Sequence, residues 1–188
     1  MQTTCIAFLR AVNVGGRTVK MDRLRALLGD LGLEGVRTYI QSGNVFFREE
    51  AGADRAALAA RIEEHLEEAL GFAVPAVLRT VDEVAAALEG DPFGGVTVTE
   101  DIRLCVVFLT GPVPPGTTFP VVSPKGDFTL LGLTAAGDAH LVVDQSKSGG
   151  RPGNPAAFME KTFGPDVQAT SRFFHTLEKI VAAARKDD

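Results

Sequence analysis

The chain has 188 residues, of which 45% are hydrophobic and 23% are charged, so it is a globular protein with room for one domain or two small ones. Its 19 basic and 24 acidic side chains give a net charge of -5. This sign disfavours broad nucleic-acid binding, in which affinity comes mainly from neutralising phosphates. A chain of this length buries roughly 70% of its unfolded surface, so it needs no metal or disulfide to fold.

Cysteine use and hydropathy predict a cytoplasmic protein that does not enter a membrane. Cys5 and Cys105 each lie in a short apolar run, which favours two buried thiols over a disulfide. The N-terminal apolar stretch is too short for a signal peptide, and no run reaches the ~18 apolar residues of a membrane span. His65, His140 and His175 have no metal-ligand spacing, so no metal site is expected.

The first eighty residues alternate between strand and helix patterns. Short apolar runs predict strands at 4–10, 36–41, 45–47 and 74–79. Apolar residues at three- and four-residue steps predict a helix from Met21 to a stop at Gly32. They predict a second helix between Asp54, its expected cap, and Gly71. The resulting order, β-α-β-β-α-β, is that of a ferredoxin-like unit.

The second half follows this order with one change. A helix predicted at 82–88 closes the first half. In the second half, strands are predicted at 102–110, 128–133, 140–143 and 167–171, and helices at 156–163 and 173–184. Residues 111–116 are too rich in proline to be helical, so a Pro/Gly loop stands where the first helix would be. Residues 145–155 form a polar glycine loop that lacks the spacing of a P-loop, and we expect a mobile surface segment there.

Matching residues recur between the two halves. Cys5–Leu9 aligns with Cys105–Leu109 at one constant offset, and Leu70–Arg79 aligns with Phe163–Arg172 at another. We therefore expect an α+β protein of two ferredoxin-like β-α-β-β-α-β subdomains related by internal duplication. The second copy is degenerate, because a Pro/Gly loop replaces its first helix. The expected subdomains are residues 1–92 and 93–188.

Several stretches of the chain resemble one bacterial protein family. They are LRAVNVGG at Leu9–Gly16, VRTYIQSGNVFF at Val36–Phe47, FAVPAVLRT at Phe72–Thr80 and ATSRFFHT at Ala169–Thr176. In these stretches the sequence resembles the DUF1697 family, whose function is unknown. The resemblance implies two ferredoxin-like subdomains, but it implies no activity and offers no catalytic residues. The chain departs most from the family pattern between residues 113 and 155.

Two polar glycine turns, Asn13–Gly16 and Gln41–Asn44, are predicted to meet at one edge of the first sheet. In the strand order 4-1-3-2, the first two strands run parallel and therefore end at the same edge, where the third strand begins. Glycine N–H groups, a helix N-terminus and two cations at one edge predict a site for an anion. The candidate binding residues are Asn13, Gly15, Gly16, Arg17, Lys20, Gln41, Ser42, Gly43 and Asn44.

The same turns have a purely structural interpretation, in which Gly15 and Gly16 permit positive φ and residues 42–44 form an ordinary hairpin turn. Three functions are therefore considered: binding of a small anionic or phosphorylated ligand, a protein-interaction or scaffold module that allows an oligomer, and RNA binding. RNA binding is the weakest, because the first strand is apolar on both faces and the net charge is negative. No nucleophile elbow or dinucleotide fingerprint is present, so no catalytic residue or cofactor is assigned.

Overall fold

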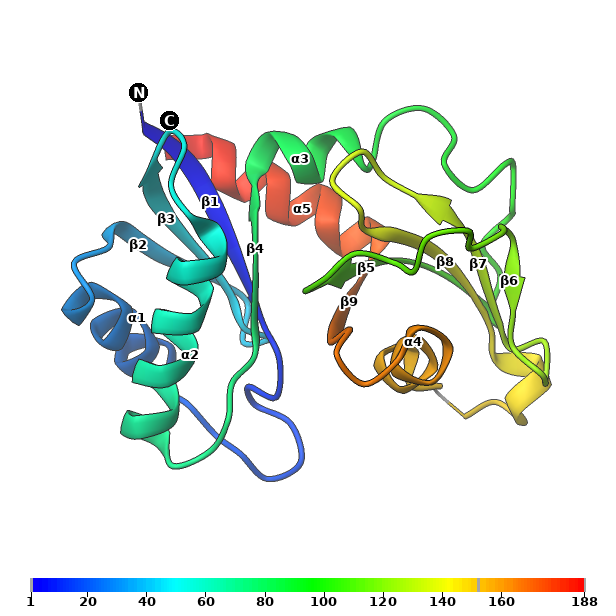
Figure 1. Cartoon of the computed structure of the whole chain (residues 1–188), viewed down its shortest axis with the longest axis horizontal. Helices are drawn as coiled ribbons and strands as arrows, with labels where there is room; N and C mark the ends of the chain where they lie inside the picture. Colours follow the sequence, from blue (N-terminus) through cyan, green and yellow to red (C-terminus); the bar gives the residue numbers. More distant parts are fainter. Residues whose placement is uncertain (1, 152, 188) are drawn as a thin grey trace. The chain divides into compact units, whose positions relative to one another are not determined.

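The computed structural model describes residues 2–151 and 153–187. It is a mixed α+β structure with two antiparallel sheets and five α-helices in the described residues, and neither sheet closes into a barrel (Figure 1). The chain forms two compact units. The first consists of Met1–Asp82 with Ile180–Asp188, and the second of Glu83–Lys179. No described helix is long and apolar enough to cross a membrane.

The first unit is built on a four-stranded sheet with the predicted order of strands. Its strands are β1 (Gln2–Leu9), β2 (Glu34–Tyr39), β3 (Asn44–Glu50) and β4 (Ala76–Thr80). They lie in the order β2-β3-β1-β4. Since β3 is antiparallel to both β1 and β2, those two strands run parallel and end at the same edge of the sheet. Pro75 immediately precedes β4, where its missing N–H interrupts no ladder.

Helices α1 (Met21–Asp30) and α2 (Arg55–Leu70) cover one face of this sheet (Figure 1). Four leucine and isoleucine side chains in the middle of the predicted helical stripes are fully buried and share one core with β1, β3 and β4. Each such side chain contributes about 1.5–3 kcal/mol by leaving water. They are Leu24, Leu28, Ile62 and Leu66. Packing, more than intrinsic propensity, therefore holds these helices in place.

Both ends of α2 are set by the residues predicted to set them. The Asp54 side chain accepts a hydrogen bond from the Ala57 N–H at 3.0 Å, which satisfies one of the amides left open at the start of the helix. Gly71 ends the helix with φ +79°, and its N–H donates to the carbonyl of Glu67. The predicted cap and stop are confirmed.

The last turn of the final helix, α5 (Phe174–Ala184), lies within the first unit. There the Arg37 guanidinium donates to the carbonyls of Ala183 and Ala184 at 3.4 and 3.2 Å. It also lies over the Phe46 ring, 5.3 Å from its centroid. A cation at this position satisfies open carbonyls and opposes the negative end of the helix dipole. Arg37 therefore attaches the end of α5 to β2.

The second unit has a five-stranded antiparallel sheet in the order β6-β7-β8-β5-β9. Its strands are β5 (Ile102–Leu109), β6 (Val121–Val122), β7 (Phe128–Leu133), β8 (Ala139–Asp144) and β9 (Ala169–Phe173). No helix occurs between β5 and β7, a stretch that is described throughout, as the Pro/Gly loop predicted. Strand β6 was not predicted, because two residues are too short to show a periodicity.

The remaining elements are short. Helix α3 (Val81–Ala86) follows β4, and α4 (Pro155–Phe163) precedes β9. The predicted polar glycine loop begins with a 3-10 turn at Gln145–Ser148, because the Asp144 carboxylate accepts from the Ser146 N–H at 3.1 Å. Pro152 of this loop lies outside the described residues. A second 3-10 turn, Arg185–Asp187, follows α5.

Residues aligned by the sequence repeat occupy matching positions in the two sheets. Cys5 pairs with Thr80 across β1 and β4, and Cys105 pairs with Phe173 across β5 and β9. In both units the cysteine-bearing strand lies between its last strand and the strand that follows a hairpin turn. The two constant offsets in the sequence therefore correspond to a common pairing register.

Both cysteines are free and buried, and burial raises the pKa of the Cys105 thiol to about 12, partly offset by Arg103. We therefore expect its native-state alkylation to be slower by roughly a thousandfold than that of an exposed cysteine, in proportion to its thiolate fraction. Peptide mapping by mass spectrometry after labelling at neutral pH, with and without urea, measures this. Rapid labelling of folded protein at Cys105 would contradict the burial described here.

Candidate functional site

The two polar glycine turns lie side by side at one edge of the first sheet. The Asn13 side-chain amide donates to the carbonyl of Gln41 at 2.9 Å, and the Leu9 N–H donates to the carbonyl of Gly43 at 2.8 Å. The first contact joins residues 28 positions apart. The predicted proximity of the turns is thus present in the structure, whereas their binding of a ligand stays a prediction.

Both polar atoms of the Asn13 side chain form hydrogen bonds within the protein. In addition to the bond to Gln41, its Oδ1 accepts from the Val19 N–H at 2.7 Å. Its backbone has φ +55°, a conformation that Asn tolerates better than most residues. Asn13 therefore folds the segment between β1 and α1 back onto the β2–β3 hairpin, and its amide acts as a positioning group.

The second turn is packed tightly beneath the first. Asn44 is fully buried, and its Nδ2 donates to Ser42 Oγ at 2.9 Å and to the Tyr39 carbonyl at 3.3 Å. Gly43 has φ +75°, and a Cβ there would lie 3.0 Å from the Leu9 carbonyl oxygen and 3.1 Å from the Leu9 Cβ. Only glycine fits such a backbone approach without displacement. Asn44 and Gly43 thus shape this edge and are not open to a ligand.

Backbone strain is concentrated at this edge. In the described residues, positive φ outside glycine occurs at Ala11 (+64°), Asn13 (+55°) and Ile40 (+51°), all in or just before the two turns, within the irregular segments 10–16 and 40–43. Such a conformation costs an L-residue roughly 1–2 kcal/mol, and it is rarest for β-branched side chains such as Ile. Residues of this kind cluster at binding and catalytic sites, where surrounding contacts hold them. No sequence signal marks Ala11 or Ile40.

The remaining candidates face solvent. Gly15 and Gly16 are exposed with positive φ, and a Cβ on either would meet no atom within 4 Å. The Arg17 guanidinium lies over the Phe72 ring at 4.9 Å from its centroid. Lys20 is exposed and precedes α1 without giving it a side-chain cap. The first-turn amides of α1 consequently lack the kind of partner that Asp54 gives α2.

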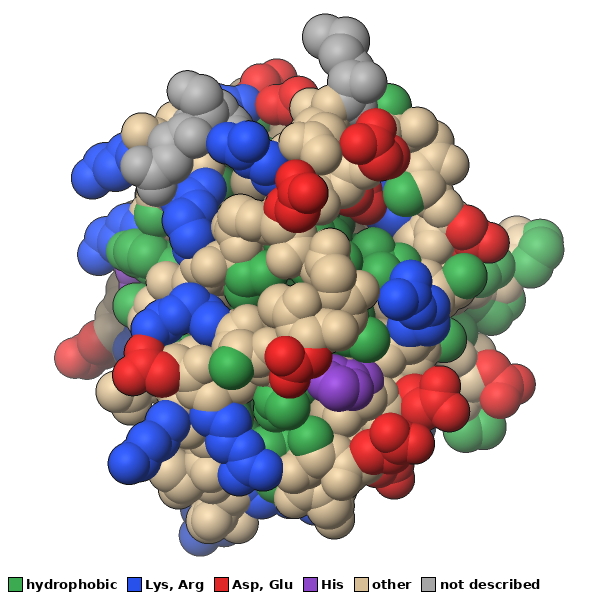
Figure 2. Space-filling model, turned by 90° about the vertical axis from the view of Figure 1, so that its left-hand side faces the viewer, with side chains coloured by type: hydrophobic (Ala, Val, Ile, Leu, Met, Phe, Trp, Pro, Cys, Tyr) green, Lys and Arg blue, Asp and Glu red, His purple; other side chains and the backbone are tan. Residues whose placement is uncertain are grey.

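Charge and apolar surface both occur at this edge. On the face that Figure 2 presents, Lys and Arg side chains lie mainly on one half and Asp and Glu mostly on the other. At the edge itself, Arg17 and Lys20 are exposed. Val14 and Ile40, one in each turn, are 57% and 48% exposed. Asp22 lies in the first turn of α1 and pairs with Arg25. The edge therefore offers exposed backbone at Gly15 and Gly16, the positive charges of Arg17 and Lys20, and two exposed apolar side chains.

Other polar residues have structural roles. Glu63 of α2 is half-buried, and its carboxylate accepts from the Ala76 N–H at 2.7 Å. The His140 ring contacts the Ala87 carbonyl at 2.8 Å. Burial lowers the pKa of Arg172 to about 10. In the described residues, no cluster of three or more His, Cys, Asp or Glu side chains could hold a metal ion.

The close packing at Gly43 gives a matched pair of substitutions. We expect Gly43→Ala to lower the free energy of unfolding more than Gly15→Ala does. Both place alanine at positive φ, at a cost of roughly 1–2 kcal/mol, but only Gly43 adds overpacking of about 1–3 kcal/mol against Leu9. Urea denaturation of both variants measures the difference, and equal losses would contradict the packing described here.

Comparison with known proteins identifies a family but no activity. The family model described as "Protein of unknown function (DUF1697)" matches residues 1–127. A solved structure, the conserved bacterial protein SP0830 from Streptococcus pneumoniae, is similar over 99% of this chain and 100% of that chain, with a TM-score of 0.68 and 21% identity. This likeness concerns the fold alone. No curated protein matches. Because the family model spans more than half of the sequence, the chain belongs to the DUF1697 family of proteins of unknown function.

Proposed function

We propose that this protein binds a small anionic or phosphorylated ligand at the edge formed by the two glycine turns. The observation that carries the proposal is the strained backbone at Ala11, Asn13 and Ile40, held in place by the Asn13 amide. A protein gains nothing in stability from three left-handed residues in contacting turns. A requirement for a particular arrangement of backbone groups at this edge accounts for them.

The candidate residues divide into two roles under this proposal. Gly15, Gly16, Arg17 and Lys20 are exposed and would supply N–H groups and positive charge, together with the open first turn of α1. The buried or internally bonded members would position them: these are Asn13, Gln41, Ser42, Gly43 and Asn44. Val14 and Ile40 would contact an apolar part of the ligand.

A ligand screen with one charge variant tests this proposal. Isothermal titration calorimetry against nucleotides and phosphorylated metabolites should detect binding by the wild type, and Lys20→Gln should weaken it about tenfold, as expected for losing one charge-assisted contact. Lys125→Gln, which removes an exposed lysine from the second unit, is the matched control. If no ligand binds, or if both variants bind as the wild type does, the proposal is wrong.

The second candidate is an interaction module without a small ligand. It is favoured by Val14 and Ile40, whose exposed apolar side chains sit on adjoining turns. We expect the double variant Val14→Ser, Ile40→Asn to abolish any self-association that light scattering detects, since Asn tolerates the positive φ at position 40. RNA binding gains no support, because every residue from Cys5 to Leu9 is buried and leaves β1 no free face for bases.

We also infer that the two halves are ferredoxin-like copies of one ancestral unit, the second degenerate. The common pairing register of Cys5 and Cys105 and the missing helix between β5 and β7 support this inference. The division into 1–92 and 93–188 stays a prediction. The compact units differ from that division in two places: residues 83–92 belong to the second unit, and Ile180–Asp188, which includes the last residues of α5, belongs to the first. The boundary predicted from the sequence therefore does not coincide with the boundaries of the compact units.

A further inference from the structure

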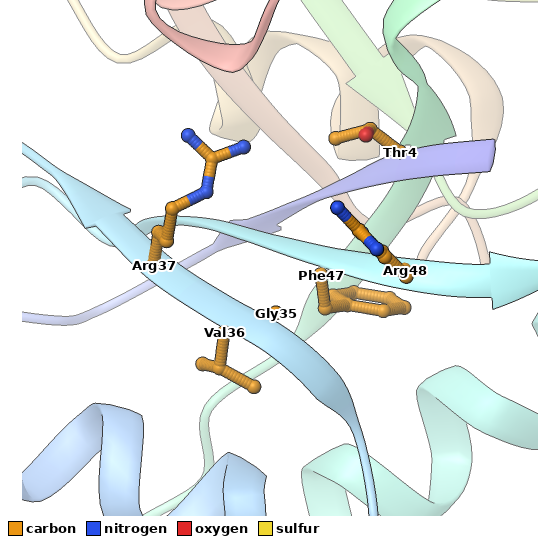
Figure 3. A pocket seen from close by; sticks show the side chains of 6 residues that line it. All are labelled: Thr4, Gly35, Val36, Arg37, Phe47 and Arg48. Atoms are coloured by element: carbon orange, nitrogen blue, oxygen red, sulfur yellow. The ribbon is translucent and has the colours of Figure 1, made fainter. Parts of the chain in front are cut away.

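Strand β2 contains an irregularity away from the glycine turns. Glu34 pairs with Arg48 and Arg37 pairs with Phe46, so Gly35 and Val36 together lie opposite the single residue Phe47. This is a β-bulge, and Gly35 within it has φ +63°. The bulge opens a cavity of about 270 Å³ in the sheet (Figure 3). Its lining residues are Thr4, Gly35, Val36, Arg37, Phe47 and Arg48.

The polar lining residues lie on one face of the sheet. Thr4 of β1 is directly opposite Arg48 of β3, so their side chains leave the sheet on the same side. Figure 3 shows the side chains of Arg37, Arg48 and Thr4 extending to that side, whereas Val36 and Phe47 extend to the other. Two guanidinium groups and a hydroxyl group therefore surround one opening of the cavity.

The two arginines differ in how they are held. Arg37 is held in place by the Phe46 ring and by the carbonyls of Ala183 and Ala184, to which its Nη1 and Nη2 atoms each donate, so its positive charge has a fixed position beside the cavity. Arg48 is exposed, and no carboxylate among the described residues forms an ion pair with it. The neighbouring acids at the strand ends, Glu34 and Glu50, both accept from Gln2 and do not line the cavity.

We propose that this bulge cavity is a second binding site, specific for a tetrahedral oxyanion of the phosphate or sulfate type. Guanidinium groups bind such oxyanions through paired N–H donors, and a hydroxyl can add a third contact. The volume is just below the ~300–1,000 Å³ of pockets that take drug-sized ligands, so a free oxyanion or the charged group of a small molecule is the fitting occupant. The site lies toward the Glu34 end of β2, whereas the glycine-turn edge follows Tyr39.

Amide chemical shifts can report each site separately. In ¹⁵N-labelled protein titrated with phosphate, and in parallel with sulfate, we expect the Gly35 amide resonance to shift in a saturable way. Sodium chloride at matched ionic strength should not move it. Arg48→Gln should weaken the Gly35 response about tenfold or more, the effect of losing one of two charge-assisted contacts. Arg61→Gln, which removes an exposed arginine of α2 that is outside the cavity lining, should leave it unchanged.

Each outcome of this titration either supports or overturns the bulge site. A Gly35 shift that saturates, fails in Arg48→Gln and persists in Arg61→Gln supports the bulge site, and the stronger of the two titrants identifies its preferred oxyanion. A Gly35 resonance that does not move, or that responds equally in Arg48→Gln and the wild type, overturns it. Shifts confined to Gly15 and Gly16 would overturn it as well, while supporting the separate site at the glycine turns. Thermal melts of both variants establish that they are folded.

Discussion

The first unit depends on a single strand that is buried on both of its faces. Every side chain from Cys5 to Leu9 is buried, and the backbone of β1 pairs with β3 on one side and β4 on the other. A central strand of this kind permits no shift of register, because a one-residue slip would turn both of its faces over. Its fixed C-terminal end determines where the chain enters the first glycine turn, and hence which part of the hairpin that turn can contact.

The Asn13 side-chain amide then fixes the position of the first turn relative to the hairpin. By donating to the Gln41 carbonyl and accepting from the Val19 N–H, it connects the hairpin, the first turn and the approach to α1. Hydrogen bonds of this sort contribute about 0.5–1.5 kcal/mol each, comparable to the cost of one residue at positive φ. The strain at Ala11 and Ile40 thus persists because neighbouring contacts, including those of the buried Asn44, outweigh it.

Patterns in the sequence predicted the elements that are caused by neighbouring residues in the chain. They did not predict features that depend on pairing with another strand or on contact with a distant segment. The caps at Asp54 and Gly71, and the leucine stripe of α1, follow from neighbouring residues, and the strand order follows from connection rules. The bulge at Gly35 depends on how β2 pairs with β3, which the composition of β2 does not reveal. Similarly, Glu63 looks solvated on a helical wheel, but the backbone N–H of Ala76 reaches it from another segment.

The bulge has another explanation, because β2 is the edge strand of its sheet and bulges protect edges from pairing with other chains. That explanation requires only an interrupted ladder and a charged side chain. It does not require a second arginine held by an aromatic ring and by the end of α5, nor a threonine on β1, beyond the neighbouring strand β3, facing the same opening. Edge protection accounts for the irregular backbone, and the placement of Arg37, Arg48 and Thr4 around the cavity is the part that a bound oxyanion explains.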